Sequence, residues 1–405
     1  MKILYLTPSF QHPKLRGPTR HYYFIRELSR RHQITLLSLT KAQILPEAMD
    51  EMQGYAKSIH TFSVNGVTAS TWLETIGRVP AIGKRLKAFL QFHVGVTQMK
   101  QAFLKLVHDG SYDLVMFHGK PIFRVIEDWN ALPIVADFCD ATSMRYGFRM
   151  RTASWVELPA LMLRYLRIRR VEKKLMNKKP HLAFISYRDR SALLASTDGA
   201  RIIPLGIDLE YWKRRTDAAK PNCLIFTGVM DYQPNAEAAN YLIEKILPRV
   251  RQAIPNVELF IVGRNPSPRL VEKARRAPGV TVTGFVDDLR PYLERATVYV
   301  APVFTASGTQ NKVVEALAMQ VPIVATPAVY DGLRVSDDSN PPVWVASTEK
   351  EFAEQVIRLL MSHDSRELLK RDGRGYVELN FDWVRSAAML EEMCQSAIEV
   401  TLRAA

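Results

Sequence analysis

The chain has 405 residues, a formal net charge of +14 at pH 7 and 47% apolar residues, so it is too long for one compact core and predicts two well-packed domains. No apolar run approaches the roughly 18–20 residues of a membrane span, and the first strand-like run is too short for a signal-peptide core. Three cysteines (Cys139, Cys223 and Cys394) are an odd number without metal-ligand spacing, which argues against a disulfide framework and favours a reducing cytoplasm.

Strand-like and helix-like segments alternate along the chain, which predicts an α/β protein built from parallel sheets wrapped by helices. In the first half, the expected strands are Lys2–Thr7, Ile34–Leu39, Ser58–Phe62, Leu114–Phe117, Ile134–Phe138, Leu182–Ile185 and Arg201–Ile203. A polar linker within Asp208–Asn222 separates them from Leu224–Phe226, Val257–Val262, Thr281–Thr283, Tyr299–Ala301, Ile323–Ala325 and Val343–Val345. Two doubly wound, Rossmann-like domains would then face a shared cleft, because such sheets bind ligands beyond the carboxyl ends of their strands.

Three loops of the first half carry candidate residues. Gly17 follows the first strand, where it either lets the loop approach a ligand closely or forms a plain tight turn. His118 ends one strand and titrates near neutral pH, although a lone histidine at a strand end is more often structural. Asp140 follows the next strand and could orient or deprotonate a reacting hydroxyl. The orientation of Asp137 depends on how far that strand continues.

The positive charge is concentrated between Arg145 and Lys179, where eleven basic residues face two acidic ones. Trp155 and several aliphatic residues are interleaved with them, as in amphipathic segments that lie on anionic membranes. A nucleic-acid partner is not expected, because no recognition motif accompanies the charge. The alternative is a helix that covers its own core with a solvated face. Lys84–Lys105 has the same two interpretations.

The segment Ser307–Thr326 (SGTQNKVVEALAMQVPIVAT) predicts an anion site. Ser307, Gly308 and Thr309 form a turn with capping hydroxyls before a helix at Asn311–Met319, and the free N–H groups at such a helix start favour phosphate. Lys312 would add a full positive charge in the first helical turn. Glu315, one turn later, is placed to accept hydrogen bonds from ribose hydroxyls. The alternative is an ordinary helix with a surface lysine and glutamate.

Four motifs occur in a fixed order in the second half: Leu224–Asn235, Val257–Pro266, Val280–Leu293 and Ser307–Thr326. Together they resemble the donor half of the family 4 (group 1) glycosyltransferases of GT-B fold. The turn followed by Gln310-Asn311-Lys312 resembles, more narrowly, the sugar transferases associated with exosortase-type exopolysaccharide loci.

The resemblance implies a retaining hexosyltransferase that needs no metal or other cofactor and takes a nucleotide sugar as its donor. Its acceptor would be a saccharide or a lipid-linked saccharide, presented at the anionic inner face of the cell membrane. The implied domains are residues 1–212 on the acceptor side, 213–382 for the nucleotide sugar, and a helix in 383–405 that crosses back. Implied donor-site residues are Gly17, Gly228, Arg264, Phe285, Val286, Ser307, Gly308, Thr309, Lys312 and Glu315, with Asp140 and His118 as catalytic candidates.

Departures from the family pattern leave some roles open. Ser307 stands where many relatives have a second glutamate, so the residue that contacts the donor hexose is not identified. Cys139 and Asp140 stand where relatives often have a catalytic-site histidine, and Leu205 replaces a frequent asparagine. Two alternatives therefore remain: a sugar-nucleotide epimerase of GT-B-like fold, which would use the same crevice, and a catalytically weak binding subunit.

Overall fold

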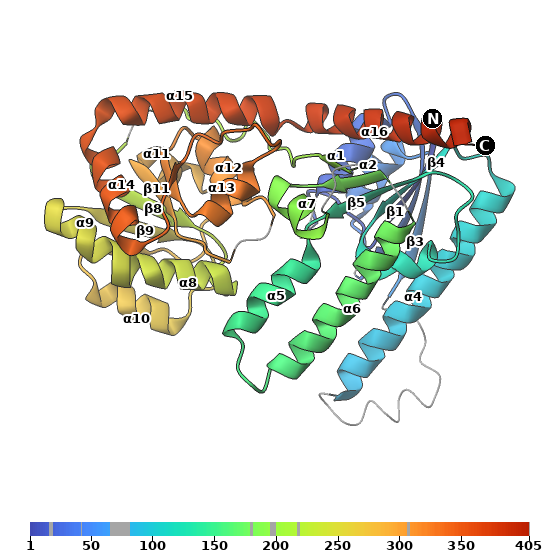
Figure 1. Cartoon of the computed structure of the whole chain (residues 1–405), viewed down its shortest axis with the longest axis horizontal. Coiled ribbons are helices and arrows are strands. Elements are labelled where there is room, and N and C mark those ends of the chain that lie inside the picture. Colours follow the sequence, from blue (N-terminus) through green and yellow to red (C-terminus); the bar gives the residue numbers. More distant parts are fainter. Residues whose placement is uncertain are drawn as a thin grey trace.

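The computed structural model describes residues 1–15, 19–41, 43–64, 82–178, 181–194, 200–216, 219–305 and 308–404. Two α/β domains lie side by side, each built on a parallel sheet (Figure 1). The first sheet has the order β3-β2-β1-β4-β5-β6-β7, and the second has the order β10-β9-β8-β11-β12-β13. The predicted fold class is therefore confirmed.

All thirteen predicted strands are present, with bounds shifted by at most one residue at either end. The first sheet contains β1 (Lys2–Thr7), β2 (Gln33–Thr40), β3 (Ser58–Ser63), β4 (Leu114–His118), β5 (Ile134–Cys139), β6 (His181–Phe184) and β7 (Ala200–Ile202). The second contains β8 (Cys223–Thr227), β9 (Glu258–Val262), β10 (Val280–Val282), β11 (Val298–Ala301), β12 (Ile323–Ala325) and β13 (Trp344–Val345). The strand order reverses between β1 and β4 and between β8 and β11, the points at which open parallel sheets bind ligands.

Helices cover both faces of the sheets. In the first half they are α1 (Arg20–Leu28), α2 (Pro46–Tyr55), α4 (Ile82–Asp109), the 3₁₀ turn η1 (Lys120–Val125), α5 (Thr142–Thr152), α6 (Leu158–Asn177) and α7 (Tyr187–Leu193). In the second half they are α8 (Gln233–Tyr241), the π-helical turn η2 (Leu242–Ile246), α9 (Leu247–Ala253), α10 (Pro268–Arg276), α11 (Arg290–Arg295), α12 (Asn311–Ala318), α13 (Pro327–Leu333), α14 (Glu349–Met361), α15 (His363–Asn380) and α16 (Trp383–Ala404). Within the described ranges, no helix is long and apolar enough to cross a membrane.

The first strand shows why these sheets need cover on both faces. Ile3 and Tyr5 belong to one core cluster, whereas Leu4 and Leu6 belong to another on the opposite face of the same sheet. Side chains alternate between the two faces along a strand, so a strand that is apolar throughout has to be covered on both sides.

The last helix, α16, leaves the second domain and packs on α1, β4, β5 and β6 of the first (Figure 1). Its first residue, Trp383, stacks on Tyr23 with ring centroids 4.4 Å apart. Trp383 also lies against Gly206, where an added Cβ would come within 2.5 Å of the indole ring. The domain boundaries at residues 212 and 382 stay a prediction.

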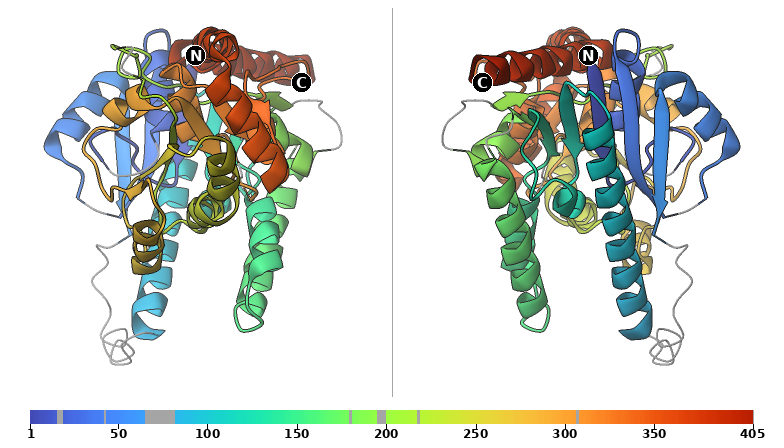
Figure 2. Two further views of the ribbon diagram at one scale, coloured as in Figure 1. Left: turned by 90° about the vertical axis from the view of Figure 1, so that its left-hand side faces the viewer. Right: turned by 90° about the vertical axis from the view of Figure 1, so that its right-hand side faces the viewer.

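Helices α4, α5 and α6 extend away from the first sheet on the side opposite α16 (Figures 1 and 2). The predicted basic segment is therefore a hairpin of two helices, α5 and α6, joined by a short turn that contains Trp155. Only three residues of α6 are buried, namely Leu161, Glu172 and Leu175. Lys179, the last residue of the predicted segment, lies outside the described residues.

Candidate active site

A cavity of about 390 Å³ opens at the carboxyl ends of β8 and β9, next to the start of α12. Its volume falls within the range of about 300–1,000 Å³ that is usual for small-ligand sites. Seven of the predicted donor-site residues line it: Gly228, Arg264, Phe285, Val286, Thr309, Lys312 and Glu315. Gly308 precedes the cavity in the turn before α12, whereas Gly17 and Ser307 lie outside the described residues.

Lys312 and Glu315 lie at the base of this cavity on α12. The Lys312 ammonium donates a hydrogen bond to Oδ1 of Asn235 and lies 4.7 Å from the ring centroid of Phe226. Burial lowers the pKa of Lys312 to about 7, and it raises the pKa of Glu315 to about 7, despite the attraction between the two side chains. With a pKa of about 7, Lys312 carries only part of its positive charge at neutral pH.

Asn235 is a cavity residue that the sequence reasoning did not single out, although it ends the first of the four motifs. Its amide nitrogen donates to the carbonyl of Val229 over 2.9 Å, which leaves Oδ1 aimed at Lys312. A Cβ at Gly228 would lie only 2.7 Å from that amide nitrogen. Gly228 therefore lets the loop after β8 close over Asn235.

The turn before α12 differs from the prediction. The N-cap residue is Gln310, and no side chain caps the helix. The Thr309 hydroxyl instead donates to the carbonyl of Ile185 in the first domain over 3.4 Å. Gly308 adopts a φ of +65°, which favours glycine, and lies next to Ile185 as well. The predicted capping turn thus connects the two domains.

A buried network lies at the switch point of the first sheet. Nε of Arg20 donates to Asp137 over 2.7 Å, and its two terminal nitrogens donate to the carbonyls of Ile203 and Pro204. Asp137 points into this network and away from the cleft, and Arg20 and the neighbouring histidines hold its pKa well below the usual range against the cost of burial. Nδ1 of His21 shares a 2.6 Å hydrogen bond with the Tyr5 hydroxyl, and the histidine tautomer decides which of the two donates. The sequence reasoning missed Arg20 and His21, because their partners are remote in the chain.

His118 belongs to this network. Its ring lies 3.8 Å from that of His21, and its Nδ1 is 3.2 Å from the carbonyl oxygen of Asp137. Burial lowers the pKa of His118, so its imidazole is neutral at pH 7. Ligand atoms of His21, His118, Asp137 and Cys139 lie within 4.8 Å of one another, as in a metal site. However, the permanent charge of Arg20 already neutralises Asp137, and it would repel a metal cation.

Asp140 lies outside this network, directly after β5, and its carboxylate is 26% exposed. One oxygen accepts from the Thr142 hydroxyl over 2.8 Å, and the other accepts from Arg145 over 3.1 Å. Lys120, another residue that the sequence reasoning did not identify, lies below it and donates to the Thr142 hydroxyl and to backbone carbonyls at the end of β5.

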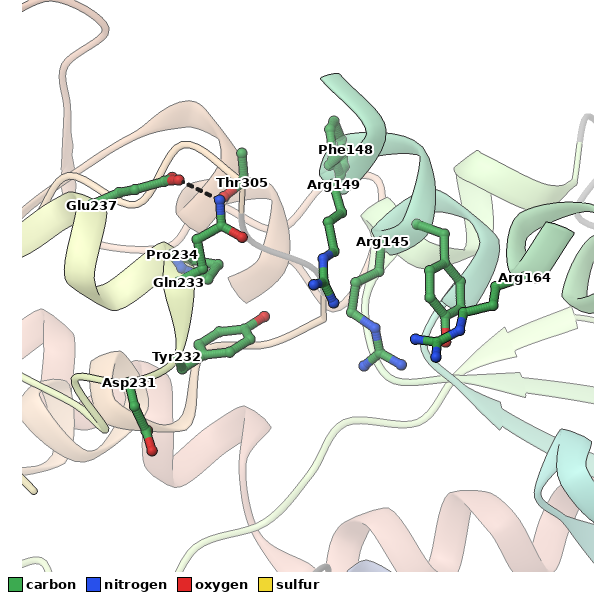
Figure 3. A pocket seen from close by; sticks show the side chains of 11 residues that line it. Arg145, Phe148, Arg149, Arg164, Asp231, Tyr232, Gln233, Pro234, Glu237 and Thr305 are labelled. Atoms are coloured by element: carbon green, nitrogen blue, oxygen red, sulfur yellow. Dashed lines mark hydrogen bonds between the residues drawn. The ribbon is translucent and has the colours of Figure 1, made fainter. Parts of the chain in front are cut away.

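A second cavity, of about 380 Å³, lies between the two domains. Its wall in the first domain consists of Arg145, Tyr146, Phe148 and Arg149 of α5 and Arg164 of α6. Its wall in the second domain consists of Asp231, Tyr232, Gln233, Pro234, Glu237 and Thr305 (Figure 3). Three arginines of the predicted membrane segment thus line the cleft, and Tyr232 borders both cavities.

Residues 221–362 match the family model of the group 1 glycosyl transferases, and this range contains every residue that lines the first cavity described above. The chain therefore has the two-domain GT-B fold, with a second domain that matches the group 1 glycosyl transferases. No curated protein matches the sequence.

Solved structures share its fold at low sequence identity. Anabaena HepE, in complex with UDP and glucose, is 14% identical, with a TM-score of 0.63 over 98% of this chain and 100% of HepE. Sucrose-phosphate synthase from Thermosynechococcus elongatus is 16% identical, with a TM-score of 0.68 over 98% of this chain and 99% of the synthase. WaaG, a glycosyltransferase involved in lipopolysaccharide biosynthesis, is 15% identical, with a TM-score of 0.56 over 96% of this chain and 99% of WaaG.

Proposed function

We propose that this glycosyltransferase moves a hexose from a UDP-sugar to a saccharide acceptor, with retention of anomeric configuration. The observation that carries the proposal is the pairing of Lys312 and Glu315 in one cavity at the switch point of the second sheet. HepE, which shares the fold along its whole length, has been solved with UDP, with UDP and glucose, and with UDP-glucose. The group 1 family match favours a transferase over an epimerase.

The donor would bind by charge and by hydrogen bonding. Lys312 and the exposed Arg264 would contact the diphosphate, and Glu315 would accept hydrogen bonds from the ribose. Phe285, which is 70% exposed beside the cavity, and Val286 would cover the base. On the opposite domain, Asp140 would orient the acceptor hydroxyl, while neutral His118 would support the end of the neighbouring strand. Asp140→Asn should therefore reduce turnover much more than UDP affinity.

Calorimetric titration with UDP tests the donor site. Lys312→Ala and Glu315→Ala should each weaken UDP binding by about 1–3 kcal/mol, the usual cost of losing a charge-assisted hydrogen bond. Lys350→Ala is the matched control, because Lys350 is a surface residue of α14 whose side chain is 79% exposed. Unchanged UDP affinity in both cavity variants, with folding intact, would refute the assignment.

Incubation with UDP-sugars distinguishes the activity from the two alternatives. A transferase given a suitable acceptor releases UDP, an epimerase yields a new UDP-sugar, and a binding subunit produces neither.

We further propose that the acceptor is linked to lipid and belongs to exopolysaccharide or other cell-surface glycan synthesis. On this proposal the protein lies on the inner face of the cell membrane. The hairpin of α5 and α6 supports a membrane contact, because Trp155 is 86% exposed at its turn and Leu163 is 69% exposed on α6. Arg169 and Lys173 are exposed on the same helix and do not line either cavity of the cleft. Such a surface would attract anionic lipid and insert apolar side chains.

Sedimentation with vesicles of increasing anionic lipid content tests the membrane contact. Wild-type protein should bind anionic vesicles and dissociate with added salt, because surface charges are screened beyond about 8–10 Å at physiological ionic strength. Replacing Arg169 and Lys173 by glutamine should lower the salt-sensitive part, and Trp155→Ser should lower the salt-resistant part. Equal binding by all three proteins would rule out this surface.

A further inference from the structure

The chain turns sharply where β5 ends. Residues 138–143, which we call the β5 loop, lead from this strand into α5 and carry Asp140. Cys139 adopts a φ of +54°, a left-handed conformation that residues other than glycine seldom take, and the pairing of β5 with β6 shifts its register at the same place. Oδ1 of Asp137 accepts from the Cys139 amide over 2.9 Å. A backbone conformation of this kind persists only where its surroundings hold it in place.

Lys120 of η1 holds the β5 loop from the neighbouring strand. It lies just beyond β4, which pairs with β5 as far as His118. The Lys120 ammonium donates to the carbonyl of Phe138 over 3.2 Å, to the carbonyl of Asp140, and to the Thr142 hydroxyl over 2.9 Å. Thr142 in turn donates to Oδ1 of Asp140, and that oxygen is 3.7 Å from the ammonium. Lys120 therefore fixes Asp140 through its backbone, through its hydrogen-bond partner and through charge.

Two buried carboxylates hold the rest of the β5 loop. Oε1 of Glu172, on α6, accepts from the Ser143 amide over 3.2 Å and lies 3.6 Å from the Lys120 ammonium. Oδ1 of Asp189, on α7, accepts from the Ala141 amide over 2.9 Å. Glu172 and Asp189 are 0% exposed, and Lys120 is 8% exposed. The loop is thus held from η1, α6 and α7 by side chains of types that are seldom buried so deeply.

Stability alone does not account for these buried charges. A buried ion pair gains little net free energy, because the desolvation of both charges offsets their attraction. Oε2 of Glu172 is buried as well, and it has no hydrogen-bond partner among the residues that the structure describes. Apolar residues of similar volume would often fill such a space at lower cost. What Lys120 adds is direction, because its three acceptors use all three N–H groups of the ammonium.

The carboxylate that Lys120 fixes lies next to the cavity between the domains. Arg145, which donates to Asp140, lines that cavity. On the facing wall, burial raises the pKa of Tyr232, while Arg145 lowers it and Asp140 raises it further. Tyr232 borders both cavities, so Asp140 is near the place at which an acceptor would meet the donor sugar.

We propose that Lys120 is a positioning residue for Asp140, holding this carboxylate in the orientation that engages the acceptor hydroxyl. This inference rests on the proposed function. Lys120 does not contact the substrate, since its ammonium has no N–H group left to donate. A reacting group displaced by about 1 Å can slow a reaction about a hundredfold, so a β5 loop that shifts on loss of Lys120 should slow turnover without weakening donor binding.

UDP release from a panel of UDP-sugars, with water in place of the acceptor hydroxyl, tests this role. Lys120→Met/Glu172→Gln removes both charges of the buried pair, so that neither is left without its partner. This variant should lower kcat at least about tenfold while KM stays within about twofold. Thr142→Val leaves the buried pair intact and removes the hydroxyl between the ammonium and the Asp140 carboxylate, so it should lower kcat as well.

Two further variants serve as controls. Glu172→Gln alone should keep most of the turnover, because Lys120 retains its three acceptors. Lys178→Met is the matched lysine control, since Lys178 donates to the carbonyl of Trp129, before the opposite end of β5, over 3.1 Å. It should leave both kcat and KM unchanged.

The Asp140→Asn background separates positioning from general stabilisation. If Lys120 acts through Asp140, Lys120→Met/Glu172→Gln should change the turnover of Asp140→Asn enzyme by less than about twofold, because residues that act as one unit are not additive. The same loss in both backgrounds, or wild-type kcat in the double variant and in Thr142→Val, would overturn the positioning role while the transferase stands. No UDP release by the wild type from any UDP-sugar would overturn the proposed function, and the role of Lys120 with it.

Discussion

At the scale of single residues, the proposed donor cavity combines charge with burial. Lys312 and Glu315 both titrate near pH 7 because burial opposes the charged form of each. Both side chains are therefore only partly charged at neutral pH, and a nucleotide that brings its own charges would change the protonation of both groups.

This titration predicts proton uptake when UDP binds at pH 8. Free Lys312, with a pKa of about 7, is mostly neutral at pH 8, whereas Glu315 is already ionised. An adjacent diphosphate stabilises the charged ammonium and raises the pKa of Lys312, so binding should take up close to one proton. UDP itself contributes little, since its terminal phosphate, with a second pKa of about 6, is already ionised.

Calorimetry in two buffers of different ionisation enthalpy measures this proton count. The Glu315→Gln variant should retain the uptake at pH 8, whereas Lys312→Ala should abolish it. The same uptake in Lys312→Ala would mean that another group carries the proton.

The candidate site residues of the second domain could be predicted where they lie close together in the sequence. Lys312 and Glu315 lie three residues apart on one helix, so the sequence pattern alone places them together. Arg20 and Asp137 are 117 residues apart, and only the order of the strands brings them into contact. No local pattern reports how strongly Lys312 is buried, so its lowered pKa could not be inferred.

At the scale of elements, the strands were predictable because parallel strands buried on both faces form short apolar runs between polar loops. The direction of the α5–α6 hairpin could not be predicted from the sequence. Composition showed an amphipathic basic segment, but which arginines face the cleft and which face solvent depends on how two helices pack against the first sheet. The prediction of a membrane surface therefore omitted the cavity that Arg145, Arg149 and Arg164 line.

The loops after β8 and β9 approach each other so closely that they require glycine. A Cβ at Gly263 would lie 1.8 Å from the carbonyl oxygen of Gly228, and the φ of Gly263 is +146°. Gly263→Ala should therefore displace the loop after β8 from Asn235 and weaken UDP binding at least tenfold, with loss of thermal stability. Gly375→Ala is the control, because that glycine lies in α15 with open space around its Cα and should gain about 0.5–1 kcal/mol. Wild-type UDP affinity in Gly263→Ala would show that the loops are not constrained as described.

At the scale of the whole molecule, the two domains share one continuous core. The larger core cluster extends from Ile3 and Tyr5 of β1 through Leu205 and Ile207 to the interior of the second domain, and it includes Leu390 and Met393 of α16. Thr309 and Ile185 add a contact on the cleft side. The domains are therefore connected at both edges of the cleft.

Removing α16 should destabilise the first domain, from which it is remote in sequence. Leu390, Met393, Cys394 and Ala397 are at most 1% exposed, so a chain that stops at residue 382 would leave an apolar face of the first sheet uncovered. We expect this truncated protein to aggregate, and in the full chain Leu390→Ala should cost about 2–5 kcal/mol. Val400→Ser is the matched control, because Val400 is 54% exposed on the same helix. A soluble 1–382 protein with an unchanged melting temperature would contradict this role of α16.

The position of α16 also has a consequence for biosynthesis. A ribosome produces the seven strands of the first sheet early, yet the helix that covers one face of β4, β5 and β6 is translated after the entire second domain. At about 5–20 residues per second, residues 203–382 take about 10–40 s to emerge, during which that apolar face is exposed. The nascent first domain is thus a natural client for chaperones, and codon changes that slow translation of the second half should lower the yield of folded enzyme.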